Sequence, residues 1–332
     1  MLRRVSTDYQ LVGIALLLSM FGLAMVYSAG QTDALTGYER FWQRQLIWLI
    51  LGFGGMIVMT RSSVRLLEWL TVPAYVGTIA LLAITLILGT GAGTAASTKS
   101  WIGIGGLRIQ PAEFAKITVV LMLAKVLAGR REAPKSLLEL WQPALIVGIP
   151  WLLIMKQPDL GTGIAFIGIF FAMLFWAGVS WPLLLLLASP AVSLILAGDT
   201  GLWGGWFLLL IALVLYYRPY PVEGVVLIVS NVAMGILAPI LWNQLQPYQQ
   251  RRLLTFLDPS ADPRASGYHV IQSQTAIGSG GWFGQGFLDG SQKRLGFLPA
   301  QHTDFIFAVT GEELGFLGVT AVLSLFAVLF LR

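Results

Sequence analysis

Two aspartates that each precede a proline are the first candidates for chemistry in this sequence. Asp258 and Asp262 follow the basic pair Arg251 and Arg252, and the residue before a proline avoids the helical region, so both carboxylates are expected in turns. A partly desolvated carboxylate at a membrane surface can have a raised pKa and act as a general base. Because an Asx turn is the simpler explanation of an isolated Asp-Pro pair, other features must decide between the two readings.

A second polar segment lies immediately before an apolar run at residues 111–129. Pro111 suits the first turn of a helix, and Glu113 and Lys116 have the i,i+3 spacing that lets two side chains pair on one helical face. Arg108 and Gln110 precede that turn. Charged residues within a membrane helix are costly and are functional candidates by default. A structural ion pair that locks helices together is the alternative.

Two further polar segments flank apolar runs. Lys156 could meet a phosphate group, whereas capping of the next helix explains Asp159. Asp304 is expected to cap the last apolar run in the same way. Glu312 and Glu313 lie inside that run and occupy different helical faces, so the two carboxylates need separate partners.

Composition places these residues in a membrane protein. The chain has 332 residues, of which 56% are hydrophobic and 11% charged, whereas soluble domains are about a quarter charged. The absence of Cys excludes disulfides and thiolate metal sites, and His269 and His302 are too few for a His-rich zinc site. The net charge of +5 fits basic residues at membrane edges better than nucleic-acid binding.

Apolar runs near the length of a membrane span define the expected elements. The sequence predicts an all-α, polytopic transmembrane helix bundle with about ten spanning helices, because spanning backbone must satisfy its own hydrogen bonds. The expected spans are 11–29, 42–60, 69–89, 111–129, 143–157, 160–178, 182–198, 202–217, 222–242 and 304–331.

The basic residues predict which side of the membrane the long loop faces. One set of ends is enriched in Lys and Arg and should be cytoplasmic: Arg3, Arg4, Arg61, Arg65, Arg130, Arg131, Lys135 and Arg218. Nine spans then precede the stretch 243–303, which is expected to form a large extracytoplasmic loop. Its aromatic residues and glycines indicate an ordered loop rather than a disordered one, with a short amphipathic helix around residues 267–277.

Several long motifs resemble the SEDS family (shape, elongation, division and sporulation proteins). The resemblance is nearly continuous over residues 256–281, and it extends to 297–307, 311–315, 108–116 and 157–163. Tyr268-His269 and residues 277–281 favour the elongation branch of the family over the division branch. The resemblance implies a peptidoglycan glycosyltransferase that polymerises lipid II at the outer face of the bacterial inner membrane, with its active site on the periplasmic side.

The resemblance also implies roles for residues and partners. The essential aspartate of the family falls on Asp262, as general base, and not on Asp258. Together with charge and position, it assigns the lipid II head group and pyrophosphate to Arg108, Gln110, Glu113, Lys116, Lys156, Asp159, Arg251, Arg252, His302 and Asp304. The expected partners are a class B penicillin-binding transpeptidase and other membrane proteins of the elongation complex. A divalent cation such as Mg²⁺ or Mn²⁺ is compatible with the chemistry, although no ligand spacing demands one.

Two departures from the family keep other functions open. The family has seven helices before the large loop and three after it, whereas this sequence predicts nine and one. Residues 199–242 are therefore expected to be an insertion, and the chain is expected to be one transmembrane domain over 1–332 that lacks the last two family helices. A lipid II flippase and a non-catalytic scaffold for a transpeptidase remain the alternatives.

Overall fold

The computed structural model describes residues 8–33, 38–91, 99–104, 107–217, 219–245, 250–251, 254, 266–298 and 300–332. Over these residues the chain is almost entirely helical, and ten long helices lie at the ten predicted spans. Their bounds are α1 Tyr9–Gly30, α2 Phe41–Arg61, α3 Val64–Leu88, α4 Pro111–Ala128, α5 Trp141–Met155, α6 Leu160–Trp176, α7 Trp181–Leu196, α8 Thr200–Tyr217, α9 Pro221–Gln244 and α13 Ile306–Leu331.

Short elements complete the described structure. Two of them, α11 (Ser266–Ser279) and α12 (Ser291–Arg294), lie between α9 and α13, and single 3-10 turns precede α2 and α5 at Tyr38–Arg40 and Leu138–Leu140. The helix expected around residues 267–277 is thus confirmed as α11. The sequence did not predict the antiparallel hairpin of β1 (Ile102–Ile104) and β2 (Leu107–Ile109), in which Gly103 pairs with Arg108.

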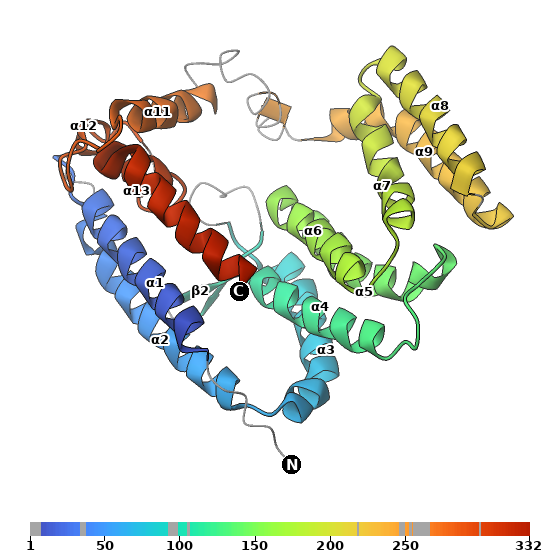
Figure 1. Cartoon of the computed structure of the whole chain (residues 1–332), viewed down its shortest axis with the longest axis horizontal. Coiled ribbons are helices and arrows are strands. Elements are labelled where there is room, and N and C mark those ends of the chain that lie inside the picture. Colours follow the sequence, from blue (N-terminus) through green and yellow to red (C-terminus); the bar gives the residue numbers. More distant parts are fainter. Residues whose placement is uncertain are drawn as a thin grey trace. The chain divides into compact units, whose positions relative to one another are not determined.

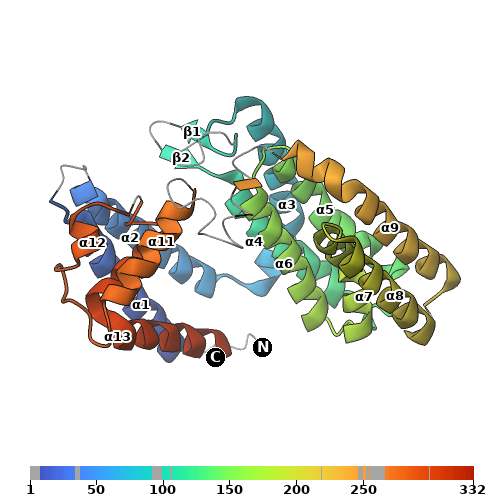
Figure 2. The same cartoon turned by 90° about the horizontal axis from the view of Figure 1, so that it is seen from above.

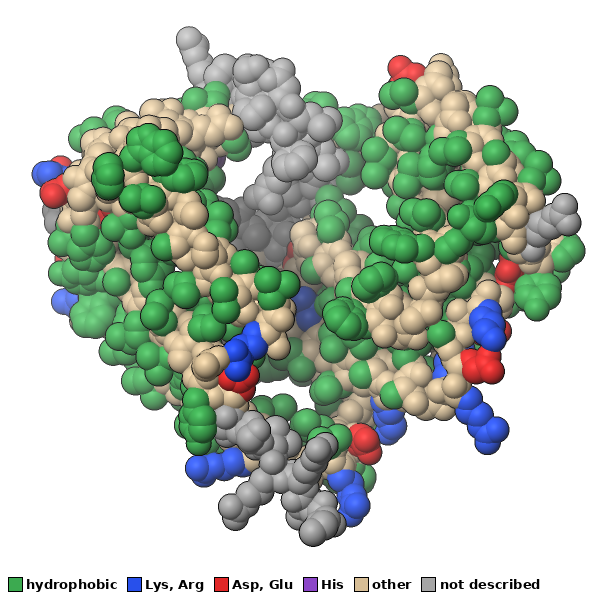
Figure 3. Space-filling model, viewed as in Figure 1, with side chains coloured by type: hydrophobic (Ala, Val, Ile, Leu, Met, Phe, Trp, Pro, Cys, Tyr) green, Lys and Arg blue, Asp and Glu red, His purple; other side chains and the backbone are tan. Residues whose placement is uncertain are grey.

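The long helices have the composition of membrane spans. Seven of the described helical segments are long and apolar enough to cross a bilayer, and α6 and α7 are shorter apolar helices. The side chains of these spans are largely accessible, since no more than 33% of the residues in each spanning window are buried within the protein. Figure 3 shows hydrophobic side chains over the helix sides, with charged side chains near helix ends and connections. The predicted all-α polytopic fold is confirmed.

The chain forms two compact units, residues 1–62 with 245–332 and residues 63–244. In the second unit, α3, α4, α5 and α6 pack around a core that includes Leu82, Val119, Ile154 and Phe166, all with 0% exposure. In Figures 1 and 2 the helices α7, α8 and α9 of this unit lie side by side. Asn231 joins α9 to α7 through a hydrogen bond from its Nδ2 to Ser189 Oγ (2.8 Å), as polar side chains do between membrane helices.

The first unit combines α1 and α2 with α11, α12 and α13. Met25 and Ala29 of α1 pack against Val309 of α13, and all three are almost completely buried. Figures 1 and 2 show α11 lying against the first half of α13. This contact places α11 on the helix that carries Glu312 and Glu313.

Candidate functional site

The starts of α4 and α6 bring two predicted site residues, Gln110 and Asp159, into contact. Gln110, the residue before α4, donates a hydrogen bond from Nε2 to Asp159 Oδ2 (3.0 Å). Asp159 caps α6, because its Oδ1 accepts the Thr162 N–H (3.1 Å) and its Oδ2 accepts the Thr162 hydroxyl (2.9 Å). Capping therefore explains only part of the role of Asp159, since the same carboxylate also ties α6 to the segment before α4.

Glu113 and Lys116 form the ion pair that their spacing predicts. The Lys116 Nζ lies 2.8 Å from Glu113 Oε1, and their side chains are 31% and 55% exposed. Pro111 is the first residue of α4, also as predicted. The pair is thus accessible from outside the protein. A purely structural ion pair that locks two helices together would not need to be accessible.

Arg108 and Lys156 add exposed positive charge to the same unit. Arg108 lies in β2, two residues before Gln110, and Lys156 is the residue that ends α5, three positions before Asp159. Both are exposed. The unit therefore presents two cations, one ion pair and a carboxylate that caps a helix, all on neighbouring segments. This set suits an anionic, hydroxyl-rich ligand.

The catalytic candidate itself lies outside the described residues. Asp262, with Asp258 and Arg252, falls in segments that the structure does not describe, and Ser266 begins α11 four positions after Asp262. Arg251 is described and exposed. The role of Asp262 therefore stays a prediction from the sequence, while the structure shows what holds the helix that follows it.

His302 and Asp304 lie in the turn that leads into α13. The expected cap by Asp304 is wrong: α13 begins at Ile306, the preceding residue is Phe305, and no side chain caps the start of this helix. His302 packs edge-on against Phe41 of α2 (ring centroids 4.5 Å apart). Burial lowers the pKa of His302 below its usual value and outweighs the opposing effect of the Asp304 carboxylate.

The turn after α11 completes the backbone hydrogen bonds of a break in α13. Gly315 is non-helical (φ 64°, ψ −166°), so the helix bends there. The carbonyls of Glu312 and Glu313 accept the N–H groups of Gln285 and Gly286 (2.9 and 3.0 Å). On the other side of the break, the N–H groups of residues 316 and 317 donate to the carbonyls of residues 281 and 282 (2.8 and 3.2 Å). A membrane helix can break only where such partners exist.

The side chains of Glu312 and Glu313 bind different groups, although Lys293 contacts both, through its backbone N–H and its Nζ. Glu312 accepts hydrogen bonds from the Ser291 hydroxyl and from the backbone N–H groups of Gln292 and Lys293 in α12 (3.2, 2.6 and 3.2 Å). Glu313 pairs with Lys293 Nζ (2.5 Å), and both side chains are 0% exposed. Sequence reasoning did not identify Lys293, since nothing in a single lysine of a polar loop signals burial.

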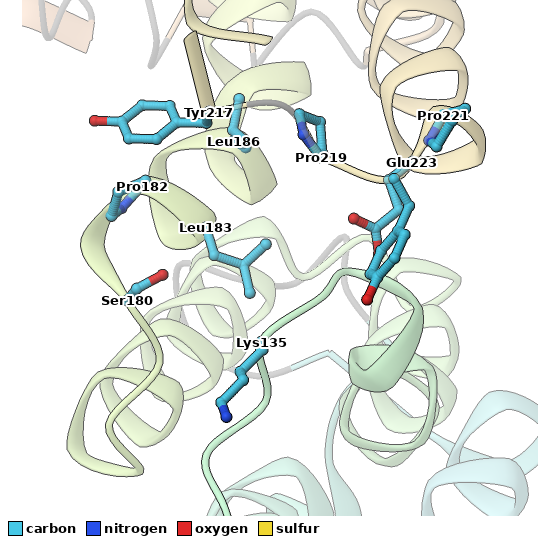
Figure 4. A pocket seen from close by; sticks show the side chains of 10 residues that line it. Lys135, Ser180, Pro182, Leu183, Leu186, Tyr217, Pro219, Pro221 and Glu223 are labelled. Atoms are coloured by element: carbon cyan, nitrogen blue, oxygen red, sulfur yellow. The ribbon is translucent and has the colours of Figure 1, made fainter. Parts of the chain in front are cut away.

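A pocket at the other end of the second unit contains none of the predicted substrate-binding residues. This pocket of about 390 Å³ lies between the starts of α7 and α9 and the end of α8, with Ser180, Tyr217 and Glu223 among its lining residues (Figure 4). Glu223 Oε1 accepts the Leu138 N–H (3.1 Å). Lys135 also lines the pocket, and its Nζ pairs with Glu132, which is not a lining residue. The charged groups of the pocket are thus used within the protein.

Among the residues that the structure describes, no group of three or more Asp, Glu or His side chains is placed to hold a metal ion. A divalent cation such as Mg²⁺ or Mn²⁺ therefore stays a prediction from the sequence.

The fold and the polar helix ends define a polytopic helical membrane protein. The family model FTSW_RODA_SPOVE, described as "Cell cycle protein", matches residues 9–198 and 182–332, and the chain belongs to this family. The two matches overlap over residues 182–198, which include most of α7, the helix after which the sequence predicts an insertion. That prediction and the single-domain assignment remain predictions.

Named relatives and a solved structure agree with this assignment. The chain is 34% identical to "Peptidoglycan glycosyltransferase RodA" of Treponema pallidum (strain Nichols), over 98% of this chain and 81% of the relative. It is 33% identical to "Peptidoglycan glycosyltransferase MrdB" of Escherichia coli (strain K12), over 99% and 75%. Its fold is similar to a chain solved in "Structural coordination of polymerization and crosslinking by a peptidoglycan synthase complex" (TM-score 0.64, 26% identity, 99% and 77% covered).

Proposed function

We propose that this protein is a peptidoglycan glycosyltransferase that polymerises lipid II during cell elongation. Family membership over nearly the whole chain carries the proposal, because relatives at 33–34% identity bear this activity in their names. The accessible cluster of Arg108, Gln110, Glu113, Lys116 and Asp159 supports it, since this set of charges suits a glycan head group that bears pyrophosphate.

The proposed reaction is a single displacement with inversion at the anomeric carbon. Asp262 accepts the proton of the 4-hydroxyl of the acceptor sugar, and that oxygen forms a bond to the anomeric carbon of the donor. The bond between this carbon and the pyrophosphate breaks, and undecaprenyl pyrophosphate leaves with the electron pair. An α-linked donor gives a β-linked product. One carboxylate suffices for proton transfer because pyrophosphate leaves as a stable anion, unlike the alcohol that a general acid protonates in glycoside hydrolysis.

The leaving group requires positive charge. Arg108, Lys116 and Lys156 are the described candidates in the second unit, and exposed Arg251 is the described candidate in the first. Charge-assisted hydrogen bonds to a pyrophosphate stabilise the negative charge that develops as the bond breaks. Glu113 holds Lys116 in place, while Gln110 and Asp159 fix the two helix starts.

The proposed location is the bacterial inner membrane, with the active site on the periplasmic side. Two features support this proposal: nine long helices precede the loop that carries Asp262 in the described part of the chain, and the distribution of basic residues favours a cytoplasmic start. A class B transpeptidase is the proposed partner, because a similar fold was solved in a complex that couples polymerisation and crosslinking.

Purified protein in liposomes with lipid II tests the function. A ladder of glycan strands on a gel is the expected result, whereas transfer of lipid II between leaflets without polymer would support a flippase instead. If the protein neither polymerises nor moves lipid II, and activity is seen only in an added transpeptidase, the result would support a scaffold. Among the predicted site residues, Arg108, Gln110, Glu113 and Lys116 lie just before or near the start of α4. Lys125 near its other end donates to the Glu68 carbonyl (3.2 Å). This distribution of charge favours chemistry at one membrane surface over a transport path, which needs polar residues through the full depth of the membrane.

A further inference from the structure

Glu312 and Glu313 hold the loop between α11 and α13 in two ways. Their backbone carbonyls accept the N–H groups of Gln285 and Gly286 in the turn after α11. Their side chains hold α12, Glu312 through backbone N–H groups and Glu313 through the Lys293 ammonium group. Two adjacent residues of one membrane helix thus fix both the turn and the short helix that follows it.

The side-chain part of this arrangement is completely buried. Glu312, Glu313 and Lys293 are each 0% exposed. Ser28 of α1 donates its hydroxyl to Glu313 (2.5 Å) and lies 3.0 Å from Lys293 Nζ, so the cluster also includes the first helix. A buried ion pair is costly to form and contributes stability only when its geometry is satisfied, so its use here points to a role in specifying one arrangement.

Close contacts between glycines connect this cluster to α11. A Cβ atom on Gly280 would lie 2.0 Å from the Gly311 carbonyl oxygen, and one on Gly284 would lie 2.0 Å from that of Glu313. The end of α11 and its turn therefore contact the α13 backbone directly. α11 begins four positions after Asp262 in the sequence.

We propose that Glu312, Glu313 and Lys293 are positioning residues that set the location of Asp262 by fixing α11, its turn and α12 on α13; this inference rests on the proposed function. The three residues need not contact the substrate. They act through the loop, so a defect in them lowers the rate of glycan transfer more than the apparent affinity for lipid II, since a small misplacement of a reacting group costs a large factor in rate.

The test compares Lys293→Met with Arg294→Met in the full chain. Arg294 is the adjacent residue, and its side chain makes an exposed ion pair with Asp33 (3.4 Å), so it is a matched control. For Lys293→Met we expect kcat for glycan polymerisation to fall at least about tenfold, with KM for lipid II changed by less than about twofold. Arg294→Met is expected to stay within about twofold of wild type in both.

Hydrogen–deuterium exchange gives a readout that does not depend on activity. Lys293→Met is expected to speed amide exchange over residues 266–298, with unchanged exchange in α3–α6. Wild-type kcat together with wild-type exchange in this variant would overturn the inference. So would faster exchange spread over all helices, because that would indicate a general loss of stability. If the wild type makes no polymer but the exchange result is as expected, the proposed function would be refuted. The structural role of Lys293, Glu312 and Glu313 in fixing the loop on α13 would still hold.

A milder variant covers the case in which Lys293→Met does not fold. Ser28→Ala removes a hydroxyl that contacts both charged groups and leaves their charges in place. We expect faster exchange over residues 285–298 and a loss of kcat of about threefold or more, consistent with the loss of a hydrogen bond to a charged group. Unchanged exchange and unchanged kcat in Ser28→Ala would contradict the inference.

Discussion

Gln110 donates a hydrogen bond to Asp159 across the starts of two helices that are separated by 49 positions in sequence. The bond joins the residue before α4 to the residue that caps α6, and both are residues that family resemblance assigns to substrate binding. The same carboxylate accepts the Thr162 N–H and hydroxyl. Asp159 thus combines a structural role with a position next to the candidate binding residues of α4.

Replacing Asp159 with Ala should separate these roles. Loss of the cap is expected to cost about 0.5–2 kcal/mol of stability, measured as a lower unfolding temperature in detergent. Asp159→Asn retains an oxygen that can cap the helix, so it should be nearly as stable as wild type. If Asp159→Asn also loses polymerisation while remaining stable, the charge of Asp159 has a functional role, whereas wild-type activity would limit Asp159 to capping.

Replacing Glu113 with Gln tests the accessible ion pair of α4. Exposed pairs contribute only about 0.2–1 kcal/mol, so little change in unfolding temperature is expected. Polymerisation should nevertheless fall by about a hundredfold, because Lys116 would no longer be held for the leaving group. Glu132→Gln, which removes an exposed i,i+3 pair in the connection between α4 and α5, is the matched control and should retain activity. Equal activity of Glu113→Gln and its control would contradict this role.

The break in α13 predicts different costs at two neighbouring glycines. Gly284 has a φ of +80°, and a Cβ there would also lie 2.0 Å from the Glu313 carbonyl oxygen. Gly284→Ala should therefore cost about 2–5 kcal/mol from backbone strain and overpacking together. Gly281 has a φ of +54° with nothing within 4 Å, so Gly281→Ala should cost only about 1–2 kcal/mol. Thermal unfolding of the two variants measures the difference, and equal losses would argue against the close contact.

His302 predicts a loss of stability in acid. Its folded pKa is lowered by burial, so the unfolded chain binds the proton first as pH falls below about 6.5. Stability is therefore retained above that value and decreases below it. His302→Phe removes this proton and keeps an aromatic ring beside Phe41, so the drop in unfolding temperature between pH 7.5 and 5.5 should be smaller than in wild type. An identical drop in both proteins would show that other groups control the acid response.

The sequence predicts the helices well because membrane spans have a simple physical signature. An apolar run of sufficient length must be helical in lipid, and this rule correctly located all ten long helices, including α8 and α9 of the expected insertion. Local spacing was also sufficient for the Glu113–Lys116 pair. Capping by Asp304 failed because a residue type near a helix start does not fix the residue at which the helix begins.

Contacts between residues far apart in the chain could not be predicted from the sequence. The burial of Lys293 depends on Ser28 and Glu313, 265 and 20 positions away, and no local pattern encodes that meeting. The loop that completes the broken hydrogen bonds of α13 also depends on tertiary contact. Its glycines were visible in the sequence, but their close approach to Gly311 and Glu313 was not.

The most direct test of the account compares Asp262→Ala with Asp258→Ala in reconstituted protein supplied with lipid II. Both aspartates precede a proline and lie four positions apart, so their substitution should affect turn formation similarly. We expect Asp258→Ala to produce glycan strands and Asp262→Ala to produce none, with equal unfolding temperatures. Wild-type polymerisation by Asp262→Ala would contradict the assignment of Asp262 as the general base.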